Sequence, residues 1–228
     1  MSNAAPPPEI LVLGSGNFGT CLANHLAHKG FSVLMWGRSQ SLAKSINELH
    51  KNPKYLSSIP LSPRLRAITD ITPEQLAQTR YLVLAIPTQS LRRVLHPLRG
   101  HLDPKTILVC ASKGIENDSL CFPYNIISEE FGEHFASRTA ILSGPSFASE
   151  VADQEPTAVS VGCKDAEVCN RTQELFHSSY FRVYTTQDPI GLEVAGALKN
   201  VIALASGAAA GLGFQQNARA ALLARGLA

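Results

Sequence analysis

A glycine-rich turn near the N-terminus has the spacing of a dinucleotide-binding site. Residues 14–19 read Gly-Ser-Gly-Asn-Phe-Gly, which fits G-x-G-x-x-G, and they directly follow an apolar segment at residues 10–13. In this pattern Gly14 permits a tight turn, Gly16 lets the backbone approach a pyrophosphate, and Gly19 lets a helix pack closely on a strand. The free N–H groups at the start of that helix would face the phosphates. A glycine-rich turn that binds nothing is the weaker interpretation, because the flanking strand and helix patterns are both in place.

The end of the second apolar segment carries the group expected to meet the adenosine ribose. A carboxylate there would bind the 2′-hydroxyl of NAD, whereas an arginine suits the 2′-phosphate of NADP. This chain has Trp36-Gly37-Arg38-Ser39 and no carboxylate. Arg38 can offer two parallel N–H donors to a phosphate, so the sequence favours NADP. Arg38 could instead be a solvated arginine that stacks on adenine, and both cofactors would then be usable.

Polar side chains follow two further apolar segments. Lys113 comes shortly after the apolar residues 106–111, and Gly144 and Ser146 come after the apolar residues 139–142. Ligands of open α/β sheets bind beyond the carboxyl ends of the strands, so we expect both turns to share one edge. A lysine ammonium and a hydroxyl beside backbone N–H groups suit a phosphorylated substrate. Either turn alone would more often be an ordinary loop.

Lys199 is the only charged residue between Glu193 and Arg219, within an otherwise apolar helical pattern. An ammonium in apolar surroundings is costly, and its pKa tends to fall toward neutrality. Such a lysine can protonate a developing alkoxide and take the proton back in the reverse reaction. A lysine that reaches the surface from one side of the helix is an equally good interpretation.

The segments that must position these residues alternate between short apolar runs and helical patterns. This alternation is typical of a parallel sheet wrapped by helices, so the expected fold class is α/β with a Rossmann-type doubly wound sheet. Strands are predicted at residues 10–13, 32–36, 81–86, 106–111, 139–142, 158–161 and 181–184, helices at 20–29, 42–49 and 192–212, and an irregular loop at 51–63.

The character of the sequence changes near residue 188. We expect a dinucleotide-binding domain over residues 9–187 and the beginning of an all-helical substrate domain over residues 188–228. The helix predicted at 192–212 is apolar on most faces, which is typical of a helix inside a larger helical core. The sequence ends within another helical pattern that starts near Ala218, so we expect the second domain to be truncated.

Composition narrows the classes of function. The chain has 228 residues, of which 45% are hydrophobic and 17% charged, so it is not expected to be disordered. Its net charge is +2 with no basic run, so no nucleic-acid partner is expected. Five cysteines without Cys-x-x-Cys spacing, and an N-terminus without a signal-peptide pattern, are typical of cytoplasmic proteins. The uncharged residues 201–214 are too few to span a membrane. No metal-ligand spacing and no G-x-S-x-G nucleophile is present.

These motifs resemble those of the bacterial-type NAD(P)-dependent glycerol-3-phosphate dehydrogenases, over nearly all of the chain after the first eight residues. The resemblance is carried by the turn at 14–19, Trp36-Gly37-Arg38, Asn52-Pro53-Lys54-Tyr55-Leu56, Ser112-Lys113-Gly114, Gly144-Pro145-Ser146-Phe147-Ala148, Gly196-Ala197-Leu198-Lys199-Asn200 and Asn217-Ala218-Arg219-Ala220-Ala221-Leu222. The glycine turn is common to many dehydrogenases. The lysine and serine turns, followed by the Lys199 helix in that order, are far more specific.

The resemblance implies interconversion of dihydroxyacetone phosphate and sn-glycerol 3-phosphate by hydride transfer with NAD(P)H, for phospholipid synthesis. It implies that Lys199 is the general acid/base and that Lys113, Gly144 and Ser146 hold the substrate beside it. The dinucleotide-binding residues would be Gly14, Gly16, Asn17, Phe18, Gly19, Arg38, Tyr55, Lys113 and Ala148. The full-length protein would be a homodimer.

Departures from the family pattern leave other interpretations open. Ser57 and Ser58 stand where the family usually has proline and glycine, and Ala224 stands where threonine is usual. The family's second domain supplies an aspartate and a Ser-Arg-Asn segment beyond this sequence, so we expect the chain to bind dinucleotide but turn over poorly or not at all. The alternatives are another Rossmann-type hydroxyacid or ketoacid reductase, and a dinucleotide-sensing module without catalysis.

Overall fold

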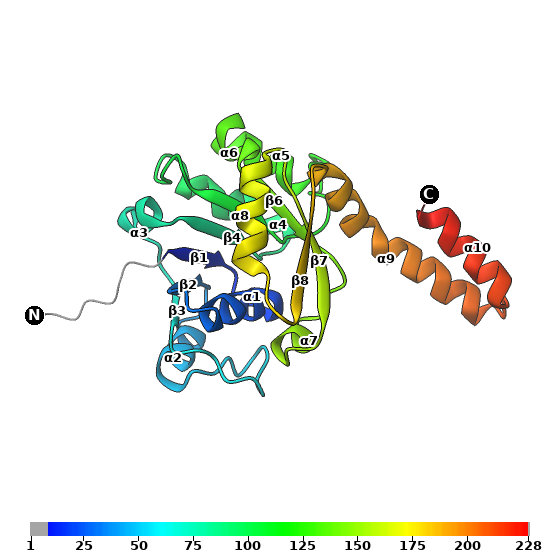
Figure 1. Cartoon of the computed structure of the whole chain (residues 1–228), viewed down its shortest axis with the longest axis horizontal. Coiled ribbons are helices and arrows are strands. Elements are labelled where there is room, and N and C mark those ends of the chain that lie inside the picture. The colour runs from blue at the N-terminus through cyan, green and yellow to red at the C-terminus, as the bar shows by residue number, and fades with distance from the viewer. Residues whose placement is uncertain (1–8, 228) are drawn as a thin grey trace, which may run out of the picture.

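A single mixed sheet forms the centre of the protein (Figure 1). The computed structural model describes residues 9–227. Residues 1–8 lie outside it, and the prediction that the N-terminus is not a signal peptide rests mostly on them. The strand order is β3-β2-β1-β4-β5-β6-β7-β8. The strands are β1 (Ile10–Leu13), β2 (Val33–Trp36), β3 (Leu65–Ile68), β4 (Tyr81–Leu84), β5 (Ile107–Cys110), β6 (Thr139–Ser143), β7 (Thr157–Gly162) and β8 (Phe181–Thr186).

Helices cover both faces of the sheet. They are α1 (Asn17–His28), α2 (Gln40–Leu49), α3 (Pro73–Gln78), α4 (Thr88–Leu95), α5 (Pro123–Phe131), α6 (Glu133–Ser137), α7 (Ala148–Ala152), α8 (Ala166–Phe176), α9 (Pro189–Gly211) and α10 (Gln216–Leu227), with a 3₁₀ turn at His96–Leu98. Buried side chains of α1, α2 and α8 pack on one face, and those of α3, α4, α5 and α6 pack on the other. This arrangement confirms the Rossmann-type doubly wound α/β fold.

The central strands are apolar at every position because both of their faces are covered. In β1, Ile10 and Val12 belong to the core under α1 and α2, whereas Leu11 and Leu13 belong to the core under α4 and α5. All four side chains are at most 1% exposed. A continuous apolar run is therefore what a two-sided parallel strand requires.

The structure differs from the sequence-based expectation in two strands. β3 pairs with β2 at the edge of the sheet, although residues 65–68 were not expected to form a strand. Its alternation of buried and exposed side chains, with Arg66 outward, lacks the continuous apolar run of the inner strands. β7 pairs with β6 in the antiparallel direction, and β8 runs parallel to β7. A strand pattern carries no information on direction, so the reversal was not visible in the sequence.

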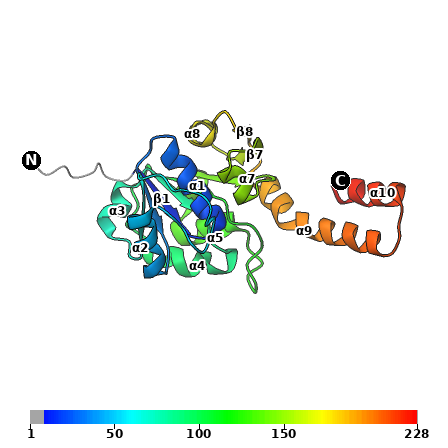
Figure 2. The same ribbon diagram turned by 90° about the horizontal axis from the view of Figure 1, so that it is seen from below.

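Helix α9 starts on the sheet and then leaves it. Its first turns pack on β7, where a side chain at Gly162 would come within 2.9 Å of Pro189 and 2.8 Å of Leu192. Beyond the sheet, α9 extends to one side and α10 folds back along it (Figure 2). Among the described residues of this extension, Val201, Leu204 and Leu212 are 61%, 76% and 78% exposed.

By length and composition alone, α9 could cross a membrane. It has 23 residues and a mean hydropathy of 1.3 over its most apolar window, and no part of that window is buried. The prediction from sequence considered only the uncharged residues 201–214 as a candidate membrane span. The helix begins earlier and includes Glu193 and Lys199. The absence of a membrane span stays a prediction.

Glu193 anchors the start of α9 to the rest of the protein. Its carboxylate is buried, and its Oε1 accepts the backbone N–H of Tyr124 at 2.9 Å, at the start of α5. Its Oε2 has no hydrogen-bond partner among the described residues. The N-terminus of α5 favours the negative charge of the Glu193 carboxylate, whereas burial of the carboxylate disfavours that charge.

Candidate dinucleotide and substrate site

The glycine turn is shaped by close backbone contacts. Gly14 has φ +125°, and its N–H donates to the Trp36 carbonyl at 3.0 Å. A side chain on Gly14 would overlap the carbonyl oxygen of Ala85, and one on Gly19 would overlap the carbonyl oxygen of Gly14. Both positions therefore require glycine for packing. A side chain on Gly16, in contrast, would meet no described atom within 4 Å.

The first turn of α1 presents unpaired backbone donors beside Gly16. The helix begins at Asn17, three residues earlier than the sequence pattern predicts, with Gly16 as its N-cap and no capping side chain. No acidic residue lies in this first turn. The first N–H groups of a helix have no partner within the helix, and the helix dipole favours an anion in front of them. The turn and helix thus form a site suited to a pyrophosphate.

A cavity of about 380 Å³ lies between the glycine turn and the two polar turns. The residues that line it are Asn17, Phe18, Ala85, Ile86, Ala111, Ser112, Lys113, Ser146, Phe147 and Ala148. Five of the predicted site residues, from three separate segments of the chain, therefore meet in one place. Its lining combines small apolar side chains with a lysine and a hydroxyl, which suits a flat ring beside a small polar molecule.

Lys113 and Ser146 converge on the carbonyl oxygen of Gly144. The Lys113 Nζ donates to this oxygen at 3.3 Å, and the Ser146 Oγ donates to it at 3.4 Å. A side chain on Gly144 would come within 2.9 Å of the Val159 Cα, so this turn lies directly against β7. Burial, and then the nearby charge of Lys199, lower the pKa of Lys113. An ammonium that is poorly solvated and faces a second cation is stabilised by a bound anion.

Two hydroxyl groups that the sequence did not single out hold the Lys113 turn in place. The Thr88 Oγ1 donates to the Lys113 carbonyl at 2.9 Å, and the Ser112 Oγ donates to the Ile86 carbonyl at 2.6 Å. These bonds tie the turn after β5 to the turn after β4. Nothing in the spacing of these residues along the chain predicts the contacts.

Lys199 lies near Lys113 but not in apolar surroundings. Gly196, three residues earlier on α9, lies against the polar turns, since a side chain there would be 3.1 Å from the Ser143 Oγ and 3.9 Å from the Lys113 Cδ. Lys199 itself is exposed. The expectation of an apolar environment around Lys199 is wrong for the described residues, and of the two sequence interpretations the structure favours a lysine at the surface of its helix. The Lys199 charge nevertheless acts on Lys113.

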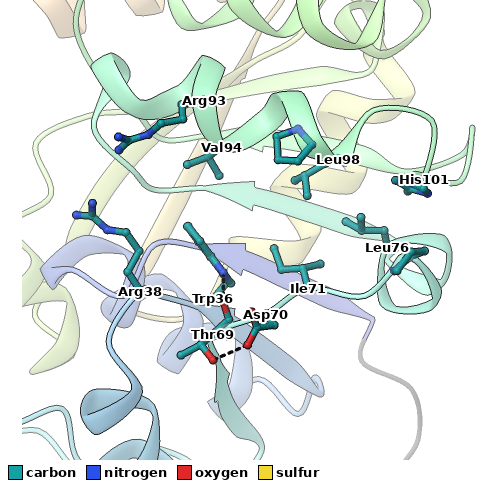
Figure 3. A pocket seen from close by; sticks show the side chains of 12 residues that line it. Trp36, Arg38, Thr69, Asp70, Ile71, Leu76, Arg93, Val94, Leu98 and His101 are labelled. Carbon is teal, nitrogen blue, oxygen red and sulfur yellow. Dashed lines mark hydrogen bonds between the residues drawn. The ribbon is translucent and has the colours of Figure 1, made fainter.

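Arg38 lines a second cavity, of about 510 Å³, and lies at one end of it (Figure 3). The turn that carries Arg38 is pressed against the glycine turn, because a side chain on Gly37 would overlap the Ser15 Oγ. Within the cavity wall, the Trp36 Nε1 donates to the Thr69 carbonyl at 2.8 Å, which fixes the indole.

Tyr55 lines neither cavity, and a neighbour that the sequence did not assign holds its loop. Asn52 is fully buried, and its Nδ2 donates to the Thr20 Oγ1 at 2.8 Å and to the Ser15 carbonyl at 3.2 Å. Its Oδ1 accepts the Tyr55 N–H at 2.9 Å. Asn52 therefore ties the irregular loop to the glycine turn, and its burial among hydrogen-bond partners is visible only in the folded structure.

Replacing Asn52 with alanine is expected to destabilise the protein and to loosen the glycine turn. The change removes three hydrogen bonds and leaves buried donors and acceptors without partners, so we expect a loss of about 2–3 kcal/mol in the free energy of unfolding. Urea unfolding of Asn52→Ala measures it. Ser57→Ala, at an exposed position of the same loop, is the control and should be neutral. Equal stability of both variants would show that the Asn52 bonds contribute nothing.

Comparison with known proteins identifies a family that the chain matches along most of its length. The family description "NAD-dependent glycerol-3-phosphate dehydrogenase N-terminus" matches residues 9–169, and the corresponding C-terminus description matches residues 188–228. The chain is 46% identical over 219 residues to a glycerol-3-phosphate dehydrogenase [NAD(P)+] of Leptospira biflexa, covering 96% of this chain and 66% of the relative. It is 45% identical over 223 residues to the protein of the same name from Thermobifida fusca, covering 96% and 65%.

Solved structures agree as well. The glycerol-3-phosphate dehydrogenase of Coxiella burnetii superposes with a TM-score of 0.84 at 33% identity, covering 96% of this chain and 66% of that one. The Plasmodium falciparum glycerol-3-phosphate dehydrogenase gives a TM-score of 0.87 at 26% identity, covering 96% and 64%. The chain spans slightly less than two thirds of the length of these relatives. From its sequence match and its fold, the chain belongs to the NAD-dependent glycerol-3-phosphate dehydrogenase family.

Proposed function

We propose that the protein interconverts dihydroxyacetone phosphate and sn-glycerol 3-phosphate with NAD(P)H, as a step toward phospholipids. The observation that carries the proposal is the 380 Å³ cavity in which Asn17 and Phe18 of the glycine turn meet Lys113 and Ser146. A dinucleotide that enters from the turn and a phosphorylated substrate that binds the lysine would meet there. The names of the relatives agree with this activity.

The dinucleotide would lie across the glycine turn, with one half in each cavity. Gly14, Gly16 and Gly19 would bring the backbone to the pyrophosphate, and Arg38 would bind the 2′-phosphate of NADP, with NAD also accepted. The other half would lie against Asn17, Phe18, Lys113 and Ala148, and the Tyr55 loop would support the turn from outside. When bound, the reduced cofactor supplies the hydride.

The side chains of this chain would supply alignment and the proton. Lys113, Gly144 and Ser146 would orient the substrate through its phosphate or hydroxyl groups. As hydride adds to the C2 carbonyl carbon, the carbonyl electron pair moves to oxygen, and Lys199 donates a proton to that oxygen. The reverse reaction returns the proton to Lys199. A positive charge that is held in place beside the developing oxyanion stabilises the transition state more than the same charge in water does.

The arrangement of the whole protein forms part of the proposal. Residues 9–187 would be the dinucleotide-binding domain, and residues 188–228 the beginning of a helical substrate domain. The five cysteines are free thiols, four of them buried, which supports a reducing, cytoplasmic location. The protein would be a homodimer without nucleic-acid partners or a bound metal, and native mass measurement tests the dimer.

A single-turnover assay tests the activity. With protein in excess over NADPH, addition of dihydroxyacetone phosphate is expected to oxidise the cofactor, because the assay detects hydride transfer even where steady-state turnover is slow. Non-phosphorylated ketoacids should leave it reduced. Faster oxidation with a ketoacid would support a different Rossmann-type reductase. Binding of NADPH without oxidation by any substrate would support a dinucleotide-sensing module.

A further inference from the structure

A second arginine, Arg93, lines the 510 Å³ cavity together with Arg38. Arg93 comes from α4 and Arg38 from the turn after β2, and both side chains extend at the same end of the cavity (Figure 3). These two elements are 55 residues apart in the sequence, so the pairing is a product of the fold. The sequence patterns gave Arg93 no role.

Arg93 differs sharply from its neighbour on the same helix. Arg92 is turned toward a cluster of carboxylates and lies 2.9 Å from Glu116, 2.7 Å from Glu129 and 3.3 Å from Glu130. Arg93 makes no ion pair and no side-chain hydrogen bond with any described residue. Of two adjacent arginines, one is therefore part of a structural network and the other lines the cavity.

Arg38 has no carboxylate partner among the described residues either. Among the described residues that line the cavity, the acidic one is Asp70, and its Oδ2 accepts the Thr69 hydroxyl at 2.9 Å. In Figure 3, Asp70 points toward Thr69 and away from both arginines. Two guanidinium groups at the same end of a cavity repel each other, and a bound anion would lower that repulsion.

The rest of the cavity suits an aromatic base. Its walls include Trp36, Ile71, Leu76, Val94 and Leu98, and the Trp36 ring is fixed by its bond to Thr69. Its volume of about 510 Å³ falls in the range of small-molecule sites, about 300–1,000 Å³. An apolar cavity with a pair of cations at one end matches a purine nucleoside that carries an additional phosphate.

We propose that Arg93 is a specificity-determining residue that, together with Arg38, binds the adenosine 2′-phosphate and so favours NADP over NAD. This inference rests on the proposed dinucleotide-binding function and assigns Arg93 to one group of that ligand. Each of two guanidinium groups can donate a pair of hydrogen bonds to a phosphate. Two arginines can therefore bind the phosphate from two sides, whereas a single arginine binds it from one side only. NAD has a hydroxyl at this position and gains little from the second cation.

Cofactor titrations of Arg93→Ala test the inference. Trp36 is the only tryptophan and lines the cavity, so its fluorescence reports binding directly. We expect Arg93→Ala to weaken NADPH binding about tenfold and to change NADH binding less than about twofold. Arg93→Lys should recover part of the loss because it restores the charge. Adenosine 2′,5′-bisphosphate should lose affinity in parallel with NADPH, whereas 5′-AMP should not.

Arg64→Ala is the matched control, because Arg64 is exposed just before β3 and its side chain makes no hydrogen bond with the described residues. It removes one positive charge and should leave both cofactors unaffected. Unchanged NADPH binding in Arg93→Ala, or an equal loss for NADPH and NADH, would overturn the inference while leaving the proposed function intact. Failure of the wild-type chain to bind either cofactor would overturn the proposed function itself.

Discussion

Gly16→Ala is expected to weaken NADPH binding by roughly thirtyfold or more, about 2 kcal/mol, without destabilising the fold. Gly16 has φ −76°, which any residue adopts, and a side chain there would meet no protein atom within 4 Å. The added methyl group would instead occupy the space through which the backbone approaches the pyrophosphate. Titration of Trp36 fluorescence measures the binding, and thermal unfolding measures the stability.

Gly19→Ala is the matched variant with the opposite outcome. A methyl group on Gly19 would overlap the carbonyl oxygen of Gly14 and lie 2.8 Å from its carbonyl carbon, so backbone must move. We expect a loss of about 4 kcal/mol or more in the free energy of unfolding. If Gly16→Ala unfolds as easily as Gly19→Ala, or binds NADPH as well as the wild type, the glycine turn is not a cofactor site of the kind described.

Glu193→Gln is expected to stabilise the protein at pH 8 by up to roughly 3 kcal/mol. Burial raises the pKa of Glu193 from its usual 4.5 to about 7, partly opposed by the hydrogen bond from the Tyr124 N–H. Because the folded state binds this proton more tightly than the unfolded state, the Glu193 contribution to stability falls as the pH rises from about 4.5 to 7. Glutamine avoids the buried charge and can still accept the Tyr124 N–H.

The difference between the two unfolding curves, measured from pH 4.5 to pH 8, isolates this effect. Other groups titrate in the same range, among them His25, whose pKa burial lowers to about 4, and they contribute equally to both proteins. We expect no difference at the acid end and the full difference above pH 7. Glu174→Gln, an exposed carboxylate on α8, should give no difference at any pH. A variant less stable than wild type at pH 8 would refute the buried-charge interpretation.

The sequence predicts the inner half of the fold well because inner strands carry a strong physical signal. β1, β4 and β5 are covered on both faces, and their continuous apolar runs are unambiguous. The edge strand β3 has the same length as these strands but alternates buried and exposed side chains, so its apolar pattern is weak. Strand direction at β7 depends on how the chain crosses the sheet, which local patterns do not encode.

The residues of the candidate site likewise divide into those that the sequence predicts and those that it does not. Gly14, Lys113 and Ser146 lie in turns directly after strands, so the topology alone brings them to one edge. Asn52 and Arg93 contribute through contacts with segments that are distant in sequence, and no spacing rule reveals them. Burial around Lys199 was inferred from apolar neighbours, but those neighbours lie on a helix that extends beyond the sheet.

The reversed direction of β7 and β8 determines where Lys199 arrives. Because β8 runs against β1–β6, the chain makes a U-turn at Thr186 and α9 travels in the same sense as the inner strands. It passes Gly162 first and Ser143 about one turn later, and carries Lys199 about 4.5 Å beyond Gly196. If β8 ran in the same direction as β1–β6, it would end at the carboxyl edge of the sheet, and α9 would start beside the polar turns and run away from them, so Lys199 would not lie near Lys113.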